Sequence, residues 1–297
     1  MKRVMTILFL LTIVSSNLFS QRNDFPKLTG SYLGQKPPGI TPEIFAPDFI
    51  STEYHEFSCA MSPDGKAFYF TRRVPELDDN RIMVTELTED GWTEPHMITQ
   101  PGDYGAMEPY ITNDGEKFFF QSWRPFEGND QPSMDIWMME MINNKWDNLT
   151  HCDPPFNPGK AMFISMANNQ TIYTTDISKG FNPTRIVYSE LIDGKYQEYH
   201  SVGEQINLTG KEIYPCIAPN EEFLLFVRGT PEESKIFVSF RQSDGKWSSP
   251  IHVDLGLKKA SMPCLSPDGK YLFFTSTPSR LKGDIYWVDA IVIDKLK

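Results

Sequence analysis

The sequence carries arginines and carboxylates at matched intervals, and these side chains together could bind a polar ligand. Guanidinium groups engage carboxylates through paired hydrogen bonds, and an indole can stack on the face of a sugar ring. A surface built from both would suit an anionic or hydroxyl-rich ligand. The candidate ligand-binding residues are His55, Glu56, Arg72, Arg73, Glu108, Trp123, Arg124, Asp176, Glu212 and Arg228.

Carboxylates of the same set could instead cleave a glycosidic bond, a reaction that needs two carboxyl groups roughly 5 to 10 Å apart. Glu108 with Glu56, or Asp176 with Glu212, would be such a pair. His55 is the one histidine expected beside them, and a single histidine gives little support for general base catalysis. The sequence contains no Ser-His-Asp pattern, nucleophile elbow or glycine-rich phosphate loop, so no catalytic residue is assigned.

A structural role is the competing interpretation of these charges, because acid and base at the same point of a repeat would also pair across neighbouring units. The loop after Trp123 is rich in Gly, Asn, Asp and Pro, so we expect Arg124 to face solvent and Arg124→Glu to cost little stability. There is no Cys-x-x-Cys and the five histidines are scattered, so we predict no metal site and no cofactor.

The elements that must position these side chains are copies of one hairpin, first seen at residues 57–73. In its Ser-Pro-Asp-Gly turn, proline presets φ and glycine accepts the left-handed conformation that other residues avoid. The hairpin occurs five times, at intervals of 50, 54, 52 and 48 residues, and a period near 50 is typical of a propeller. The aligned turn positions are Asp64, Asp114, Asn168, Asn220 and Asp268.

Each hairpin is followed by a third apolar strand, and in four of five repeats by a second turn and a fourth strand opened by an aromatic residue. The last repeat has no such signal after Trp287, and residues 41–47 resemble the missing strand. We therefore predict an all-β fold, a propeller of five four-stranded blades in which an N-terminal strand closes the last blade; six blades is the alternative. The recurring aromatics are expected to pack on the neighbouring blade: Trp92, Trp146, Tyr196 and Trp247.

Propeller geometry would bring the candidate residues to one face. The link that enters each innermost strand and the link that leaves each second strand emerge on the same side, which we call the mouth. Cys59, Cys216 and Cys264 fall in first strands, where a small buried hydrophobic residue is the usual role, although pairing among these and Cys152 stays open.

The first 20 residues have a basic start, a short apolar run and a small residue before Gln21, which predicts a cleaved secretory signal rather than a membrane anchor. Residues 21–39 are then a surface-running lead-in and residues 40–297 the propeller domain. We expect export to the periplasm or cell surface, with no transmembrane segment after cleavage. The net charge of -11 argues against nucleic acid as a partner.

Two motifs carry a resemblance to a known family. The pattern Ser-Pro-Asp-Gly-Lys-x-aromatic-x-Phe at 62–70 and 266–274, with Asp-Ile-aromatic at 135–137 and 284–286, resembles the WD-repeat-like propeller repeats of the TolB type over residues 53–297. These repeats occur in bacterial periplasmic and outer-membrane-associated proteins, and they serve protein-binding scaffolds, peptidase side domains and glycan-active lyases alike.

The resemblance therefore implies the fold and leaves the function open. The leading hypothesis is an exported, non-catalytic propeller that binds a partner protein, a peptide or a glycan at its mouth. The alternative is a glycan-active hydrolase or lyase in a polysaccharide-degrading system. Lyases of the resembling group would need several histidines around a metal, and this chain supplies too few at the mouth.

Overall fold

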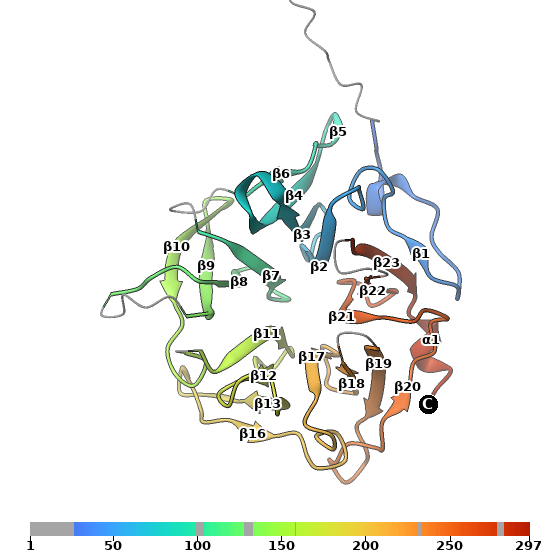
Figure 1. The fold of residues 1–297 in the computed structure, drawn as a ribbon. Helices are drawn as coiled ribbons and strands as arrows, with labels where there is room; N and C mark the ends of the chain where they lie inside the picture. Colours follow the sequence, from blue (N-terminus) through green and yellow to red (C-terminus); the bar gives the residue numbers. More distant parts are fainter. Residues whose placement is uncertain (1–26, 99–103, 128–132, 158, 231–232, 278–281) are drawn as a thin grey trace, which may run out of the picture.

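The computed structural model is a ring of β-sheets around a central axis (Figure 1). It describes residues 27–98, 104–127, 133–157, 159–230, 233–277 and 282–297. The predicted signal segment 1–20 and the first residues of the lead-in lie outside these ranges. Two short 3-10 helices, η1 (Ser31–Gly34) and η2 (Pro75–Leu77), and one helix, α1 (Ile291–Asp294), are the helical elements of the described part.

Each blade is an antiparallel sheet whose first strand lies innermost, next to the axis. Blade 1 is β2 (His55–Met61), β3 (Ala67–Val74), β4 (Asp79–Thr88) and β6 (His96–Met97). Blade 2 is β7 (Ala106–Ile111), β8 (Lys117–Ser122), β9 (Asp135–Ile142) and β10 (Lys145–His151). Blade 3 is β11 (Ala161–Met166), β12 (Ile172–Asp176), β13 (Arg185–Ser189) and β16 (His200–Ser201). Blade 4 is β17 (Glu212–Ile217), β18 (Phe223–Arg228), β19 (Lys235–Phe240) and β20 (Ile251–His252).

Blade 5 joins the two ends of the described chain. It contains β21 (Ser261–Leu265), β22 (Tyr271–Ser276) and β23 (Asp284–Asp289), and its fourth strand is β1 (Glu43–Ile44) from the N-terminal side. In Figure 1 the blue β1 lies beside the red β23, with Glu43 opposite Trp287 in the register. The predicted five-bladed propeller closed by an N-terminal strand is confirmed, and the six-bladed alternative is wrong.

Aromatic packing holds the seam between blades 5 and 1. Phe45, directly after β1, is fully buried, and its ring lies 4.8 Å from Phe68 of blade 1 and 5.0 Å from Phe273 of blade 5. The lead-in also enters this seam, since Leu33 is 1% exposed and the Tyr32 ring packs edge-on against Tyr271. Most residues of 27–39 are exposed, while Leu33 and Tyr32 anchor the segment to the core where the ring closes.

The recurring aromatics pack on the preceding blade, as the sequence predicts. Trp146 of blade 2 donates its indole N–H to the Tyr69 hydroxyl of blade 1 at 2.9 Å, and Trp247 of blade 4 packs in one cluster with Tyr173 of blade 3. Their position in the strands differs from the prediction, however. Trp92 lies in β5 (Gly91–Trp92) and Tyr196 in β15 (Lys195–Tyr196), short strands of hairpins that precede the fourth strands β6 and β16.

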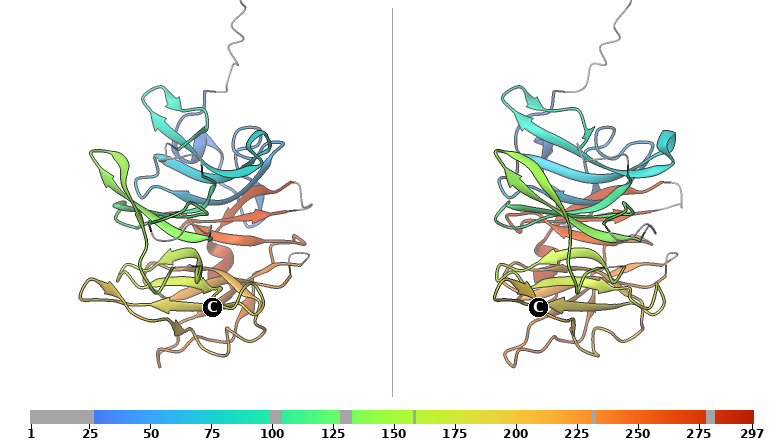
Figure 2. Two further views of the ribbon diagram at one scale, coloured as in Figure 1. Left: turned by 60° about the vertical axis from the view of Figure 1, so that its left-hand side comes forward. Right: turned by 90° about the vertical axis from the view of Figure 1, so that its left-hand side faces the viewer.

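The two faces of the ring differ in what they carry. We call link face the one on which the chain enters each innermost strand and leaves each second strand, and hairpin face the one that carries the turns between first and second strands. Figure 2 shows the ring from the side, with the strands running across its thickness between these faces. The mouth predicted from the sequence is the link face.

Every innermost strand is interrupted by a bulge at the same level. The register shift contains one residue of left-handed backbone with φ between 46° and 62°. In blades 1, 2 and 4 the amide of this residue donates to a threonine hydroxyl of the preceding blade at 3.0 Å, which fixes the height of one blade against the next. The five bulge residues define what we call the channel waist: Ser58, Glu108, Phe163, Tyr214 and Met262.

Candidate functional site

Two of the predicted charges on the link face form a closed ion pair within blade 1. Glu56 in β2 lies opposite Arg72 in β3, and the guanidinium Nε donates to the Glu56 carboxylate at 2.7 Å. The carboxylate is fully buried and also accepts from the Thr52 hydroxyl at 2.6 Å, while Arg72 Nη2 donates to the Ile50 carbonyl at 3.4 Å. The pair therefore ties the incoming link to the blade.

Blade 4 repeats this arrangement. Glu212 in β17 lies opposite Arg228 in β18, with Nε donating to the carboxylate at 2.8 Å. The Thr209 hydroxyl donates to the same carboxylate at 2.7 Å, and Arg228 Nη2 donates to the Ile206 carbonyl at 2.8 Å. The structural interpretation of these charges thus applies, with one correction: the acids and bases pair inside a blade and not across neighbouring blades.

Two further predicted ions on the link face, Asp176 and Arg73, have local partners as well. Asp176, at the end of β12, accepts from Arg185 Nε of β13 at 2.8 Å, and Arg73 pairs with Asp78 at the exposed edge of blade 1. Three of the four carboxylates considered for glycoside cleavage, Glu56, Asp176 and Glu212, are thus engaged by guanidinium groups.

Arg124 lies inside the fold, contrary to the expectation of a solvent-facing side chain. It is 3% exposed, and its guanidinium lies 5.2 Å from the centre of the Trp137 ring, 5.6 Å from Phe120 and 5.8 Å from Tyr104. The side chain alone turns inward, because the neighbouring Trp123 and Pro125 are exposed while the cation lies among aromatic faces. Its neighbour Trp123 is 39% exposed and is the side chain that faces outward.

Glu108 is the one predicted carboxylate at the channel waist. It is 4% exposed, and its Oε2 has no hydrogen-bond partner among the described residues. Burial raises the pKa of the Glu108 carboxyl to about 8, so the group is mostly protonated at neutral pH. Burial, with a smaller effect of the Glu108 carboxyl, raises the pKa of Tyr214, the bulge residue of blade 4.

A pocket of about 610 Å³ opens on the link face beside the axis, between blades 3, 4, 5 and 1. Its apolar lining is Phe57, Met162, Phe181, Ile213, Tyr214 and Met262, and its polar lining is His55, Asn182, Thr184, Lys211, Thr230, Ser234, Ser261, Thr275 and Thr277. We call it the link-face pocket. No aspartate or glutamate of the described residues belongs to its lining, so Lys211 gives it a positive character.

His55 is the one residue of the predicted site that lines this pocket. Its ring packs against Phe57 with 5.1 Å between centres, and Nδ1 has no hydrogen-bond partner among the described residues. Burial, with a smaller effect of Arg73, lowers the pKa of His55 below its usual value, so the imidazole is neutral at pH 7. Sequence reasoning missed the other lining residues because it followed charge, whereas most of the lining is apolar or uncharged polar side chains.

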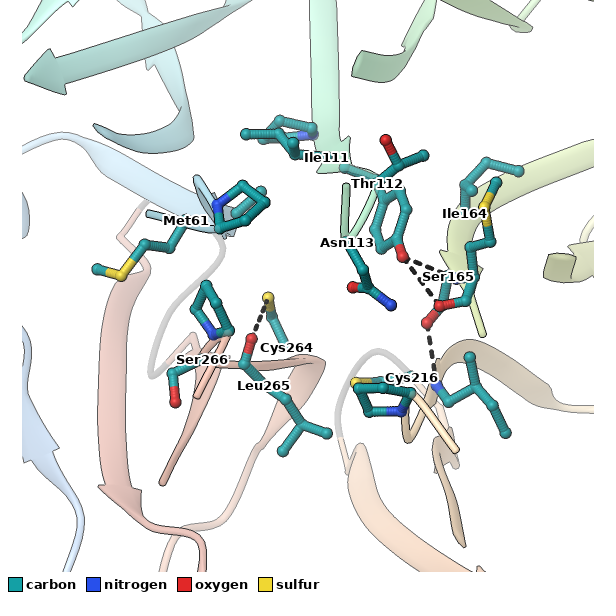
Figure 3. Close-up of a pocket in the computed structure, with 18 of the residues that line it drawn as sticks. Met61, Ile111, Thr112, Asn113, Ile164, Ser165, Cys216, Cys264, Leu265 and Ser266 are labelled. Atoms are coloured by element: carbon teal, nitrogen blue, oxygen red, sulfur yellow. Dashed lines mark hydrogen bonds between the residues drawn. The ribbon is translucent and has the colours of Figure 1, made fainter. Parts of the chain in front are cut away.

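A second pocket, of about 360 Å³, opens on the hairpin face. We call it the hairpin-face pocket. Figure 3 shows this pocket, with Cys216 and Cys264 on the innermost strands of the adjacent blades 4 and 5 and Ser165 of blade 3 beside Cys216. Tyr110 of blade 2 crosses to blade 3, where its hydroxyl donates to the Met166 carbonyl at 3.1 Å. Cys59 and Cys216 are buried, as predicted, while Cys264 is half-buried.

Neither metal ligation nor a membrane-spanning helix is indicated in the part of the chain that the structure describes. No group of three or more His, Cys, Asp or Glu side chains there could hold a metal ion. No described helix is long and apolar enough to cross a membrane.

Comparisons with known proteins support the fold. No protein-family model and no curated protein matches the sequence. Among solved structures, TolB from Acinetobacter baumannii is similar with a TM-score of 0.53 and 13% identity, over 80% of this chain and 52% of that one. A putative TolB from Agrobacterium tumefaciens has a TM-score of 0.50 and 15% identity, over 80% and 78%. A gluconolactonase from Xanthomonas campestris has a TM-score of 0.49 and 11% identity, over 85% and 94%.

At these identities the likeness concerns the fold alone. The chain spans about half the length of the Acinetobacter baumannii TolB, 52%, so it corresponds to only part of that protein. The fold is a β-propeller of the kind found in TolB-type proteins, which agrees with the resemblance read from the hairpin motifs.

Proposed function

We propose that this chain is an exported, non-catalytic propeller that binds a segment of a partner protein in the link-face pocket. The observation that carries the proposal is the lining of that pocket: an apolar floor with Lys211 and a rim of hydroxyl groups. Pockets of this composition bind an apolar side chain and fix its orientation through a few polar contacts. The predicted signal segment 1–20 supports export.

The charge of the pocket favours an acidic rather than a basic segment. Lys211 is exposed at the rim, and no described carboxylate lines the pocket to compete for it. A peptide with a bulky apolar residue next to aspartate or glutamate would therefore bury the apolar group against Phe57 and Tyr214 and present its carboxylate to Lys211. A glycan is the less suited ligand, because the carboxylates that would bind its hydroxyl groups are held in ion pairs.

Two substitutions on the pocket rim test the proposal without disturbing the core. Phe181 lines the pocket and is 66% exposed, so Phe181→Ala should leave the melting temperature unchanged while weakening peptide binding at least about tenfold. Lys211→Glu should reverse the preference from acidic to basic peptides. The measurement is titration of residues 21–297 with apolar peptides that carry an acidic, neutral or basic neighbour, followed by calorimetry.

Matched controls come from the same surface type. Leu208 is 71% exposed and lies outside the pocket lining, so Leu208→Ala should not change binding. Lys195→Glu makes the same charge change on the outer edge of blade 3. Equal loss of affinity with Phe181→Ala and Leu208→Ala, or peptide binding unaffected by either rim variant, would contradict the proposed site.

A second candidate function, glycan cleavage, rests on one observation. A buried carboxyl whose pKa is raised to about 8, as at Glu108, has the property required of a general acid. Turnover of polysaccharides or activated glycosides that is lost in Glu108→Gln would favour this function over pure binding. The absence of turnover, together with peptide binding, supports the propeller as a binding protein.

A further inference from the structure

Three cysteines occupy the same position of the repeat and face one pocket. Each is the first residue to pair again after the bulge of its innermost strand: Cys59 opposite Phe70, Cys216 opposite Leu225 and Cys264 opposite Phe273. All three line the hairpin-face pocket, and they come from blades 1, 4 and 5, which are consecutive around the ring (Figure 3).

Cys59 and Cys264 belong to the same packed region at the seam between blades 5 and 1. β2 and β21 pack against each other, and Cys264 packs on the core cluster of the seam to which Cys59 belongs. Both side chains also line the hairpin-face pocket, where the Cys264 thiol donates to the Leu265 carbonyl at 3.5 Å. Cys216, on the other side of Cys264, belongs to the core cluster between blades 4 and 5.

We propose that Cys59 and Cys264 form a disulfide in the exported protein and thereby join blade 5 to blade 1. The two thiols lose two protons and two electrons and form one S–S bond. The oxidant is a small-molecule or protein disulfide, which takes up the electrons and protons and becomes two thiols. The proposal rests on the export part of the proposed function, because disulfides persist in oxidising compartments.

The position of this bond explains why it would matter. Blades 5 and 1 meet where β1 closes the ring, and β1 pairs with β23 through two residues, Glu43 and Ile44. Those hydrogen bonds, together with the Glu56 amide that donates to the Gly283 carbonyl at 2.9 Å, are backbone connections at the seam. A bond between Cys59 and Cys264 would add a covalent link across the same seam, close to the axis and to the hairpin face.

The environment of the thiols agrees with a lasting bond. The contact with Cys59 and burial both raise the pKa of the Cys264 thiol, so the reduced pair gains no stability from ionising to thiolate. A disulfide at this place is shielded by the same packing from attack by external thiols. We therefore expect a structural bond that is slow to reduce in the folded protein.

The test uses the chain from residue 21 onward, equilibrated with oxidised and reduced glutathione and then alkylated in denaturant, so that buried but unpaired thiols also react. We expect two of the four cysteines to escape alkylation, and a proteolytic fragment pair joined through Cys59 and Cys264 in the mass spectrum. The Cys216→Ser and Cys152→Ser variants should keep the cross-linked pair. Cys216→Ser is the matched control, because Cys216 has the same register and faces the same pocket.

Stability gives a second readout that does not depend on the cross-link being detected. Reduction should lower the melting temperature of the wild-type protein and of Cys216→Ser by about 5 °C or more, and should leave Cys59→Ser unchanged. Where Cys59→Ser fails to fold, Cys59→Ala keeps the site apolar and serves instead. Four alkylated cysteines under oxidising conditions, or a bond between Cys216 and Cys264, would overturn the proposal.

Failure of this proposal is separable from failure of the proposed function. The bond is formed in vitro with glutathione, so it reports the geometry of the thiols whatever the cellular location. Trapping thiols in intact cells with a membrane-permeant alkylating agent then reports the compartment. Peptide binding by the link-face pocket is measured on Cys59→Ala, whose substitution lies on the opposite face.

Discussion

Blades 1 and 4 differ from blade 2 in how their charged side chains are arranged on the link face. In blades 1 and 4 the matching positions of the first and second strands hold an acid and an arginine, which close into a buried ion pair with a threonine and a backbone carbonyl. In blade 2 the same positions hold Ala106 and Ser122. Its acid, Glu108, lies at the channel waist, and Arg124 follows the end of β8.

The difference shows that spacing of charges along the sequence does not decide their role. Glu108 follows Ala106 by two residues, yet that shift moves a carboxylate from an ion pair at the blade end to the bulge beside the axis. The paired acids hold the incoming link in place, whereas the Glu108 Oε2 atom has no hydrogen-bond partner in the described part of the chain. The carboxylates predicted for this face therefore divide into three that pair with arginines and one buried acid, Glu108.

The largest expected effect comes from breaking both ion pairs. Arg72→Ala and Arg228→Ala each leave a fully buried carboxylate, Glu56 or Glu212, without its cation, which should cost about 3 to 5 kcal/mol of the unfolding free energy. The pairs lie in different blades with no shared partner, so the double variant should lose about the sum. Chemical denaturation of the single and double variants measures both quantities.

This prediction includes its own control. Arg73→Ala removes an exposed arginine next to Arg72 and should cost less than about 1 kcal/mol. If Arg72→Ala and Arg73→Ala caused equally small losses of unfolding free energy, the link-face arginines of blades 1 and 4 would be available for a ligand. That result would support the binding site predicted from the sequence.

The next effect concerns Arg124, the arginine of blade 2. Arg124→Glu replaces a buried cation over the faces of Phe120 and Trp137 with an anion, so we expect a loss of about 3 kcal/mol. The sequence predicted a mild effect, and thermal or chemical unfolding decides between the two. A change of the melting temperature by less than a few degrees would show that the side chain can turn outward.

The fold could be predicted from the sequence because its signal is repeated. Five copies of a turn and its flanking apolar strands fix the number of blades, and the missing strand after Trp287 points to residues 41–47 as the closing strand. The packing of the recurring aromatic residues was also predictable. A residue type that recurs at the same position of successive repeats makes the same contact with the neighbouring blade each time.

The candidate site could be predicted only in part, because its geometry depends on bulges that leave no charge pattern. His55 was placed on the link face from the order of links, and it lines the pocket. The pocket floor, including Met162 and Met262, comes from apolar residues that a search for chemistry passes over. Arg124 was misplaced for a similar reason, since loop composition after it says nothing of the three aromatic rings that surround it.

The buried Glu108 carboxyl should make the free energy of unfolding depend on pH. Its pKa is about 8 in the folded protein and near 4.5 when unfolded, so the group weakens the fold as pH rises from about 4.5 to 8, where the unfolded chain releases a proton and the folded one does not. Glu108→Gln keeps the shape and removes the charge. The variant should therefore be more stable than the wild type by about 1 to 3 kcal/mol at pH 7, and equally stable near pH 4.

Denaturation of both proteins between pH 4 and 8 measures this difference directly. Glu56→Gln is the contrasting variant, because Glu56 is paired with Arg72 and the amide should destabilise the fold at pH 7. Parallel pH profiles for the wild type and Glu108→Gln would mean that the carboxyl ionises in the fold, with a partner that accommodates its charge.

The smallest effect is expected at Trp123, next to the buried arginine. Trp123 is 39% exposed and does not line the link-face pocket, so Trp123→Ala should change the unfolding free energy by no more than about 0.5 kcal/mol and peptide affinity by less than about twofold. The sequence analysis proposed that this indole stacks on a sugar ring. Measuring the binding of a panel of oligosaccharides to the same variant tests that role. Loss of oligosaccharide binding with intact stability would move the functional surface from the pocket among blades 3, 4, 5 and 1 to blade 2. Because Arg124→Glu perturbs the fold and Trp123→Ala does not, only the tryptophan can separate binding from architecture in that blade.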